Sequence, residues 1–211
     1  MTKETNTIKT ELFFTDALKK VSIDEKRKEI LVSIADFIAS EIKKYNAINF
    51  NFICTHNSRR SQIAQVWAHY AVEHYKLKNI LSFSGGTEAT AFHRNTVKTL
   101  QEVGFEFILT EISHTNPHYE ISFEGVQQTI IGFSKVYDDT STKKPFIAIT
   151  TCSSANENCP FIPEALQRFH VEYEDPKSSD NTDSTSKKYL ETNQKIAAEM
   201  NFLFLHISKM I

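Results

Sequence analysis

The sequence predicts an α/β sandwich with a mostly parallel sheet. Short apolar segments with the character of strands occur at residues 48–53, 80–83 and 146–150, and segments with helical periodicity lie between them. Strands and helices that alternate along a chain usually form a parallel sheet covered by helices. The chain has 211 residues, which suffices for one domain with its own core, or for one domain with an extension.

The part of the chain before the first strand is expected to be helical. Residues 1–10 are polar and are expected to be disordered, whereas residues 11–45 place apolar side chains on one face at helical spacing. The segment Ser22-Ile23-Asp24-Glu25 has the S-x-x-E form of a capping box. We expect residues 1–46 to form an N-terminal helical extension and residues 47–211 to form the main domain. The apolar face of the extension either packs on the core of its own chain or forms a dimer or partner interface.

The main domain shows recognisable elements with two undefined stretches. In order, we expect a strand at 48–53, a helix at 61–76, a strand at 80–83 ended by Gly85-Gly86, a helix at 93–103 ended by Gly104, a short extended segment at 105–109, a strand at 146–150 and a helix at 189–207. Residues 111–145 give no clear pattern. Residues 177–186 are rich in Ser, Asp, Asn and Thr and are expected to form a flexible loop.

The composition argues against several classes of protein. A net charge of −2 provides no basic field for nucleic acid or a membrane surface, and no apolar run is long enough to cross a bilayer. The N-terminus lacks the apolar core of a signal peptide, so a cytoplasmic location is expected. Three cysteines without a Cys-x-x-Cys pair do not suggest a disulfide scaffold or a four-ligand zinc site. We expect no metal and no cofactor.

The segment that follows the first strand has the features of an oxyanion site. Cys54 ends the strand, and Thr55, His56, Asn57, Ser58, Arg59, Arg60 and Ser61 lead into a helix. Such a loop can direct backbone N–H groups at a tetrahedral anion, and the positive end of the helix adds to the attraction. Arg60 can grip two oxygens, and the same positive field favours a thiolate at Cys54. A thiolate at the floor of this loop is placed to attack the central atom of the anion.

The alternative is that Cys54 is only a small buried apolar residue, as free cysteines often are. The loop argues against this because it is polar, contains two arginines and two serines, and precedes a helix. The residues therefore favour a nucleophilic Cys54, with Ser61 placed to hydrogen-bond its sulfur.

The Cys-x5-Arg-Ser loop resembles that of the low-molecular-weight protein tyrosine phosphatases. It is most similar to their relatives, the thioredoxin-coupled arsenate reductases, whose usual loop is C-T-G-N-S-C-R-S-Q. Ser84-Gly85-Gly86-Thr87-Glu88 resembles the S-A-G-T-E segment after the second strand of that family. The resemblance covers residues 48–207. It implies a flavodoxin-like, three-layer sandwich of the low-molecular-weight phosphatase type, with a four-stranded parallel sheet.

Two residues of the loop depart from the family pattern. His56 stands where the family usually has glycine, so we expect a strained positive φ there. Arg59 stands where cysteine is frequent. It either changes the anion preference of the loop or points to solvent.

The other two cysteines distinguish a reductase from a phosphatase. Cys152 follows the predicted strand at 146–150, and Cys159-Pro160 lies seven positions later, as in the arsenate reductases. The resemblance implies that Cys54 forms a covalent adduct with arsenate and that Cys152 then attacks Cys54. Cys159 next takes over the disulfide, which thioredoxin or a similar dithiol reduces. The small polar residues between the pair suit a mobile loop. Two unrelated structural cysteines are the alternative.

The segment Tyr173-Glu174-Asp175-Pro176 resembles the Asp-Pro of the family, whose Asp is the general acid. This implies the same role for Asp175, with Glu174 as a weaker candidate and a simple turn as the alternative. The leading hypothesis is therefore an arsenate reductase regenerated by thioredoxin. The alternative is a low-molecular-weight phosphatase that hydrolyses phosphomonoesters through a cysteinyl-phosphate, and the third is an anion-binding or redox-sensing module without catalysis.

Overall fold

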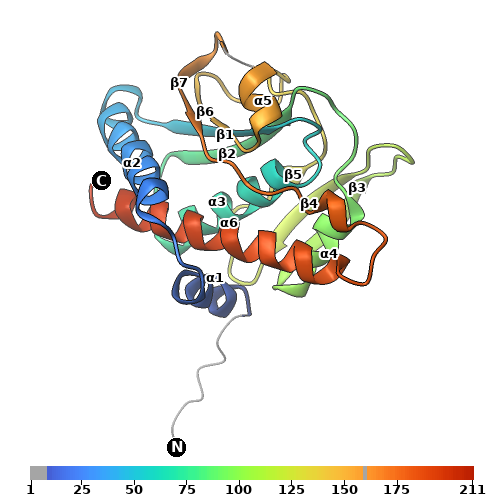
Figure 1. Ribbon diagram of the computed structural model, residues 1–211. Helices are drawn as coiled ribbons and strands as arrows, with labels where there is room; N and C mark the ends of the chain where they lie inside the picture. Colours follow the sequence, from blue (N-terminus) through green and yellow to red (C-terminus); the bar gives the residue numbers. More distant parts are fainter. Residues whose placement is uncertain (1–8, 159–160) are drawn as a thin grey trace, which may run out of the picture.

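A four-stranded parallel sheet with strand order β2-β1-β6-β7 lies at the centre of the computed structural model, which describes residues 9–158 and 161–211 (Figure 1). Its strands are β1 (Ile48–Cys54), β2 (Ile80–Gly86), β6 (Phe146–Thr150) and β7 (Ala165–His170). Cys54 lies opposite Gly86 at the carboxyl ends of β1 and β2, and Ile53 lies opposite Thr150 of β6. This register gathers the residues that follow β1, β2 and β6 at one edge of the sheet.

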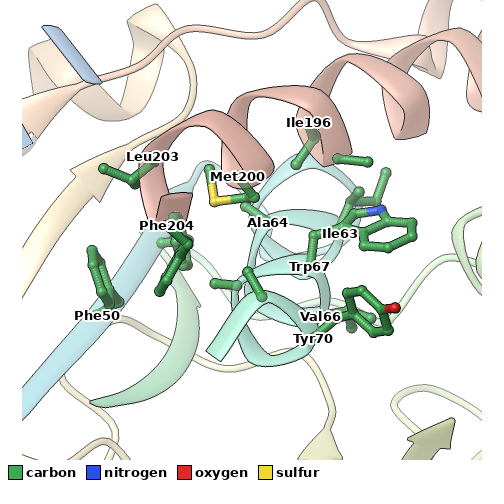
Figure 2. Packing of buried hydrophobic residues seen from close by; sticks show 14 of the residues in the cluster. Phe50, Ile63, Ala64, Val66, Trp67, Tyr70, Ile196, Met200, Leu203 and Phe204 are labelled. Carbon is green, nitrogen blue, oxygen red and sulfur yellow. The ribbon is translucent and has the colours of Figure 1, made fainter. Parts of the chain in front are cut away.

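Helices cover both faces of the sheet, which gives three layers. On one face, α3 (Arg60–His74) and α6 (Thr185–Ser208) pack against each other and against β1, as Figure 2 shows for Phe50, Trp67 and Phe204. The indole N–H of Trp67 donates to Asn193 Oδ1 at 2.6 Å, so the one polar atom of this large buried ring is satisfied. On the other face, α5 (Ser153–Asn158) covers a smaller apolar cluster that contains Ile53, Phe146 and Ala148. The predicted fold class is confirmed.

Two helices precede the sheet, α1 (Lys9–Lys20) and α2 (Glu25–Tyr45), and both contact α6. The ring of Phe14 stacks on Trp67 at 5.5 Å between centroids, which places the apolar face of α1 on the core of its own chain. The predicted capping box is wrong. Asp24, not Ser22, caps α2, because Asp24 has extended backbone angles and its carboxylate accepts the Arg27 N–H at 2.9 Å. Lys9 and Thr10 belong to α1, and residues 1–8 lie outside the described residues.

The region that the sequence left undefined contains a second, antiparallel sheet. Its strands are β3 (Phe105–Glu111), β4 (His118–Phe123) and β5 (Ile130–Gly132), in the order β3-β4-β5. The helix α4 (Arg94–Glu102) precedes β3, and Gly104 between them has a φ of 106°, as a C-terminal glycine requires. The extended segment predicted at 105–109 therefore exists, but it belongs to this sheet and not to the parallel one.

The end of one strand, one whole strand and one expected loop differ from the predictions. β2 continues through Gly85 and Gly86, which pair with Ile53 and Cys54 of β1. Glycine is needed at Gly85 because a Cβ there would lie 2.3 Å from Tyr137 Cα. β7 has no alternating pattern and was not predicted. The segment expected to be a flexible loop contains a 3-10 helix, η1 (Pro176–Ser179), and the start of α6. Within the described residues, no helix combines the length and the apolar character needed to cross a membrane.

Candidate active site

Cys54 is buried at the end of β1, with only 3% of its surface exposed, and α3 begins six residues later. Its Sγ lies 3.1 Å from Ser61 Oγ, and that oxygen accepts a hydrogen bond from Asn57 Nδ2 at 2.8 Å. Because the amide hydrogen of Asn57 occupies a lone pair of the Ser61 oxygen, the Ser61 hydroxyl hydrogen is available to the sulfur. The Ser61 hydroxyl is therefore free to donate to the Cys54 sulfur, so Asn57, Ser61 and Cys54 form one hydrogen-bonded chain.

The carbonyl groups of the loop between Cys54 and α3 are turned away from its interior. Four consecutive carbonyl oxygens accept hydrogen bonds from outside the loop or from α3: Thr55 O from Glu88 N at 2.8 Å, His56 O from Ser134 Oγ at 2.9 Å, Asn57 O from Gln62 Nε2 at 3.0 Å, and Ser58 O from His93 N at 3.1 Å. The backbone N–H groups of residues 56–59 donate to no acceptor among the residues that the structure describes. A loop with bonded carbonyls and free amides is suited to bind an oxyanion.

The strain expected at His56 lies instead at its neighbour. Asn57 has a φ of 45°, while His56 is not among the described residues with positive φ. Asparagine tolerates this conformation well, and here its side chain also holds the loop: Oδ1 accepts the Lys135 N–H at 2.9 Å. The His56 side chain is partly exposed and lies 3.7 Å from the Glu88 carboxylate. The prediction of a strained His56 is therefore wrong.

Gly86 packs directly against the loop. A Cβ at this position would lie 2.7 Å from Thr55 O and 2.8 Å from Asn57 N, so no larger residue fits without displacing backbone. The adjoining Thr87 N–H donates to Cys54 O at 3.1 Å. The segment that resembles S-A-G-T-E thus supports the loop from the side of β2.

Arg60 and Asp175 form a close ion pair. Arg60 Nη2 lies 2.5 Å from Asp175 Oδ2, and Arg60 Nη1 donates to Tyr173 O at 3.2 Å. The other carboxylate oxygen of Asp175 accepts the Lys177 N–H at 3.0 Å, which starts η1. The carboxylate thus lies at the guanidinium that is expected to grip an anion, although Asp175 and Arg60 are 115 positions apart in the chain.

Arg59 neither binds at the loop interior nor points to solvent. Its side chain is 10% exposed; Nε donates to Tyr189 Oη at 2.7 Å and Nη2 pairs with Asp180 Oδ2 at 2.8 Å. Tyr189 Oη in turn donates to Asp180 Oδ1 at 2.8 Å. Burial raises the pKa of Asp180, but the hydrogen bond from Tyr189 and the charge of Arg59 outweigh this and lower it. The expectation that Arg59 points to solvent is therefore wrong, because its charge pairs with Asp180; an effect of Arg59 on the anion preference stays a prediction.

Cys152 follows β6 and is buried, with 3% of its surface exposed. It belongs to the same apolar cluster as Cys54, and its Sγ lies 3.5 Å from Thr55 Oγ1. The two cysteines are free thiols in this structure. Cys159 lies outside the described residues. The expected loop after Cys152 is instead the short helix α5, whose Ala155 N–H donates to Cys152 Sγ at 3.4 Å.

Sequence reasoning missed a connection from the N-terminal helices to the site. Arg27 of α2 donates to Glu172 O at 2.5 Å and lies over the Tyr173 ring at 5.6 Å. Its Nε lies 3.3 Å from the buried carboxylate of Glu199. Arg27 thereby anchors the segment whose Tyr173 carbonyl holds Arg60. No local pattern in the sequence marks Arg27, Asp180 or Tyr189, because their partners are remote in the chain.

A cleft of about 850 Å³ borders the loop and offers room for a ligand. His56, Ser58, Arg59, His93 and Lys177 are among its lining residues. Its described lining contains no Asp or Glu, so the cleft favours an anionic ligand. Among residues 9–158 and 161–211, no group of three or more His, Cys, Asp or Glu side chains is arranged to hold a metal ion.

Comparison with known proteins places the chain near one group of enzymes. It is 30% identical over 133 residues to an arsenate reductase of Bacillus subtilis, covering 63% of this chain and 76% of that protein. It is 28% identical over 130 residues to arsenate reductase 2 of Staphylococcus epidermidis, covering 59% of this chain and 76% of that protein. No protein-family model matches the chain.

Solved structures support the fold. A low molecular weight protein tyrosine phosphatase from Bacillus subtilis superimposes with a TM-score of 0.50 at 14% identity, covering 77% of this chain and 98% of that one. A mutant of YwlE from Bacillus subtilis gives a TM-score of 0.51 at 14% identity, covering 75% and 97%. At such low identity these matches concern only the arrangement of strands and helices.

Proposed function

The chain belongs to the arsenate reductases of the low-molecular-weight protein tyrosine phosphatase family, and on this premise we propose that it reduces arsenate through a thiolate at Cys54. It is an enzyme of the arsenate reductase or phosphatase type. The observation that carries the proposal is the loop after β1. Its carbonyls accept hydrogen bonds, the N–H groups of residues 56–59 have no acceptor among the described residues, and the Asn57–Ser61–Cys54 chain ends on the sulfur.

The anion binds in the loop formed by Thr55, His56, Asn57, Ser58, Arg59, Arg60 and Ser61, chiefly through backbone N–H groups. Arg60 turns part of its guanidinium from Asp175 to two oxygens of the anion, because a bidentate contact with an oxyanion is geometrically favoured. Asp175 then lies beside the bound anion and supplies the proton to the departing oxygen. Arg59 contributes its backbone N–H, since its side chain is occupied by Asp180 and Tyr189.

Reduction proceeds as a relay of thiol–disulfide exchange. The Cys54 thiolate displaces one oxygen of arsenate, which leaves as water, and forms a sulfur–arsenic bond. The Cys152 thiolate then attacks the Cys54 sulfur. The sulfur–arsenic bond breaks, its electron pair stays on arsenic, and arsenite leaves. Arsenic is thereby reduced by two electrons, and the two thiols are oxidised to the Cys54–Cys152 disulfide.

Cys159 next attacks Cys152, which frees the Cys54 thiolate, and thioredoxin or a similar dithiol reduces the Cys152–Cys159 disulfide. The contact between Cys152 Sγ and Thr55 Oγ1 supports this order because it places Cys152 beside the nucleophile's loop. A relay of free thiols needs a reducing compartment, so we propose a cytoplasmic location. We also propose that residues 1–46 are an extension of a main domain at 47–211, and that neither nucleic acid nor a membrane is a partner.

Phosphatase activity is the second candidate, and the Arg60–Asp175 pair favours it. Cys54, Arg60 and Asp175 suffice to form a cysteinyl-phosphate from a phosphomonoester and to protonate the leaving group. Neither Cys152 nor Cys159 is required for that reaction. The two activities therefore differ in their dependence on the cysteine pair.

The test compares both activities in three proteins: wild type, Cys54→Ser and Cys152→Ser. Arsenate-dependent NADPH oxidation is measured with thioredoxin and thioredoxin reductase, and hydrolysis is measured with p-nitrophenyl phosphate. Cys54→Ser is expected to abolish both activities, whereas Cys152→Ser abolishes only arsenate reduction. Robust hydrolysis without any arsenate-dependent oxidation by the wild type would overturn the reductase proposal. Activity that survives Cys54→Ser unchanged would overturn both.

A further inference from the structure

A second cavity, of about 300 Å³, lies beside β2, away from the oxyanion loop. It is bounded by α3, by β2 and by residues of the segment 128–143, and none of the residues 54–61 lines it. One part of its wall is apolar, made by Leu81, Phe83, Ile130, Ile131 and Phe133. A volume of this size is at the lower end of the range for small-molecule sites.

The cavity contains a buried lysine. Lys135 is 4% exposed, and its backbone is fixed on both sides: its N–H donates to Asn57 Oδ1 at 2.9 Å and its carbonyl accepts the Gly86 N–H at 2.8 Å. Its Nζ lies 4.3 Å from the centre of the Phe133 ring, which forms part of the same wall. No hydrogen bond or ion pair joins this Nζ to another described residue, and Nζ is not among the fully buried atoms without a partner, so it keeps some contact with solvent.

An ammonium group without an acceptor is costly to bury. Burial lowers the pKa of Lys135 to about 8, and the charge of Asp139 only partly opposes this. Below that pH the group is charged and lacks a counter-ion within bonding distance. The positive charge at the cavity is thus met by the Phe133 ring and by the more distant Asp139, without a direct ion pair among the described residues.

The remaining polar groups of the lining do not supply the missing negative charge. The described lining contains no Asp or Glu, and Lys143 at its exposed side adds a second positive charge. Burial lowers the pKa of His69, the hydrogen bond to Gln128 partly opposes this, and Nε2 donates to Gln128 O at 2.7 Å. An anion would therefore meet attraction and no repulsion from the lining.

We propose that this cavity binds a small organic carboxylate. Its carboxylate pairs with Lys135 Nζ, and its apolar body lies against Leu81, Phe83 and Phe133. An inorganic oxyanion fits less well, because the apolar wall offers no donors to replace its hydration. The site is separate from the oxyanion loop, although the Lys135 backbone touches both.

Benzoate is the probe, since it combines one carboxylate with one apolar ring. Binding is measured by isothermal titration calorimetry with benzoate up to roughly 20 mM, a concentration high enough to measure a dissociation constant near 1 mM. Benzamide serves as the uncharged control of equal shape. Lys135→Met removes the ammonium, and Lys143→Met is the matched control on the exposed side. An excess of inorganic phosphate is used to occupy the oxyanion loop.

The wild type is expected to bind benzoate saturably, and phosphate leaves that binding unchanged. Lys135→Met and the exchange of benzoate for benzamide each weaken binding about tenfold or more, because a charge-assisted hydrogen bond is lost. Lys143→Met weakens it by less. Absence of saturable binding, displacement by phosphate, equal binding of benzamide, or retention in a folded Lys135→Met variant would each overturn the proposal. Lys135→Met is expected to fold, since it removes a buried charge.

Discussion

Replacing Arg27 by methionine is expected to destabilise the protein strongly. Arg27 Nε lies 3.3 Å from Glu199 Oε1, and the two side chains are 16% and 2% exposed. Methionine has a similar length and no charge, so Arg27→Met leaves the Glu199 carboxylate buried without its counter-ion. It also removes the hydrogen bond to Glu172 O, which helps to hold the segment beside Arg60.

Removing one partner of a buried ion pair usually costs about 3–5 kcal/mol of unfolding free energy. We expect about 3 kcal/mol, at the lower end of that range, because water reaches part of the Arg27 side chain. In a chain of this length that loss corresponds to a decrease in Tm of roughly 6–12 °C. The control is Lys28→Met on the same helix. Lys28 pairs with the exposed Glu25, and such a pair contributes about 0–1 kcal/mol.

The loss should depend on pH. Burial raises the pKa of Glu199, and the charge of Arg27 opposes that rise. Because its folded pKa is above its unfolded value, Glu199 stabilises the fold most at low pH, and this contribution declines as the pH rises through the folded pKa. Without Arg27 the pKa rises further. The difference in unfolding free energy between wild type and variant should therefore be smaller near pH 4.5 than near pH 7.5. The first pH is close to the unfolded-state pKa of glutamate, and the second is well above it.

Urea unfolding at both pH values measures the effect, and the double variant R27M/E199Q isolates the charge. The double variant is expected to recover part of the lost stability, because glutamine carries no charge. A loss no larger than that of Lys28→Met, or a loss that does not change between the two pH values, would refute the argument from a buried unpaired carboxylate.

Two further predictions concern the loop and its supports. Burial raises the pKa of Asp180, but Tyr189 and Arg59 lower it more, so Asp180→Asn should cost about 1–2 kcal/mol at neutral pH. Because the folded pKa of Asp180 is depressed, this loss of unfolding free energy should be present above the unfolded pKa of Asp and should fade as the pH falls below about 4. Urea unfolding in acid and at neutral pH tests this. Gly86→Ala places a Cβ 2.7 Å from Thr55 O, and we expect kcat/KM for p-nitrophenyl phosphate to fall by about tenfold or more, through displacement of the loop. An unchanged kcat/KM in a folded variant would contradict the close approach.

The elements that the sequence predicted well are those with a strong local signal. β1 alternates apolar and polar residues, β6 is a compact apolar run, and both were placed within one residue. β7 was missed because its six residues, A-L-Q-R-F-H, are partly exposed at the edge of the sheet and follow no period. The cap of α2 was misplaced because Ser22 and Asp24 both suit a cap, and the choice depends on the backbone angles at Asp24, which the residue types do not specify.

The sequence alone determined the core of the candidate site, because Cys54, Asn57, Arg60 and Ser61 lie within one eight-residue segment between a strand and a helix. A segment this short has few ways to connect β1 to α3, so its residue types indicate its shape. Only the tertiary structure decided the partners that lie far along the chain. In the folded chain Arg59 pairs with Asp180 and Tyr189, Cys152 lies beside Thr55, and Arg27 pairs with Glu199. These pairings depend on which helix packs on which face of the sheet, and packing is decided by the whole core rather than by any local pattern.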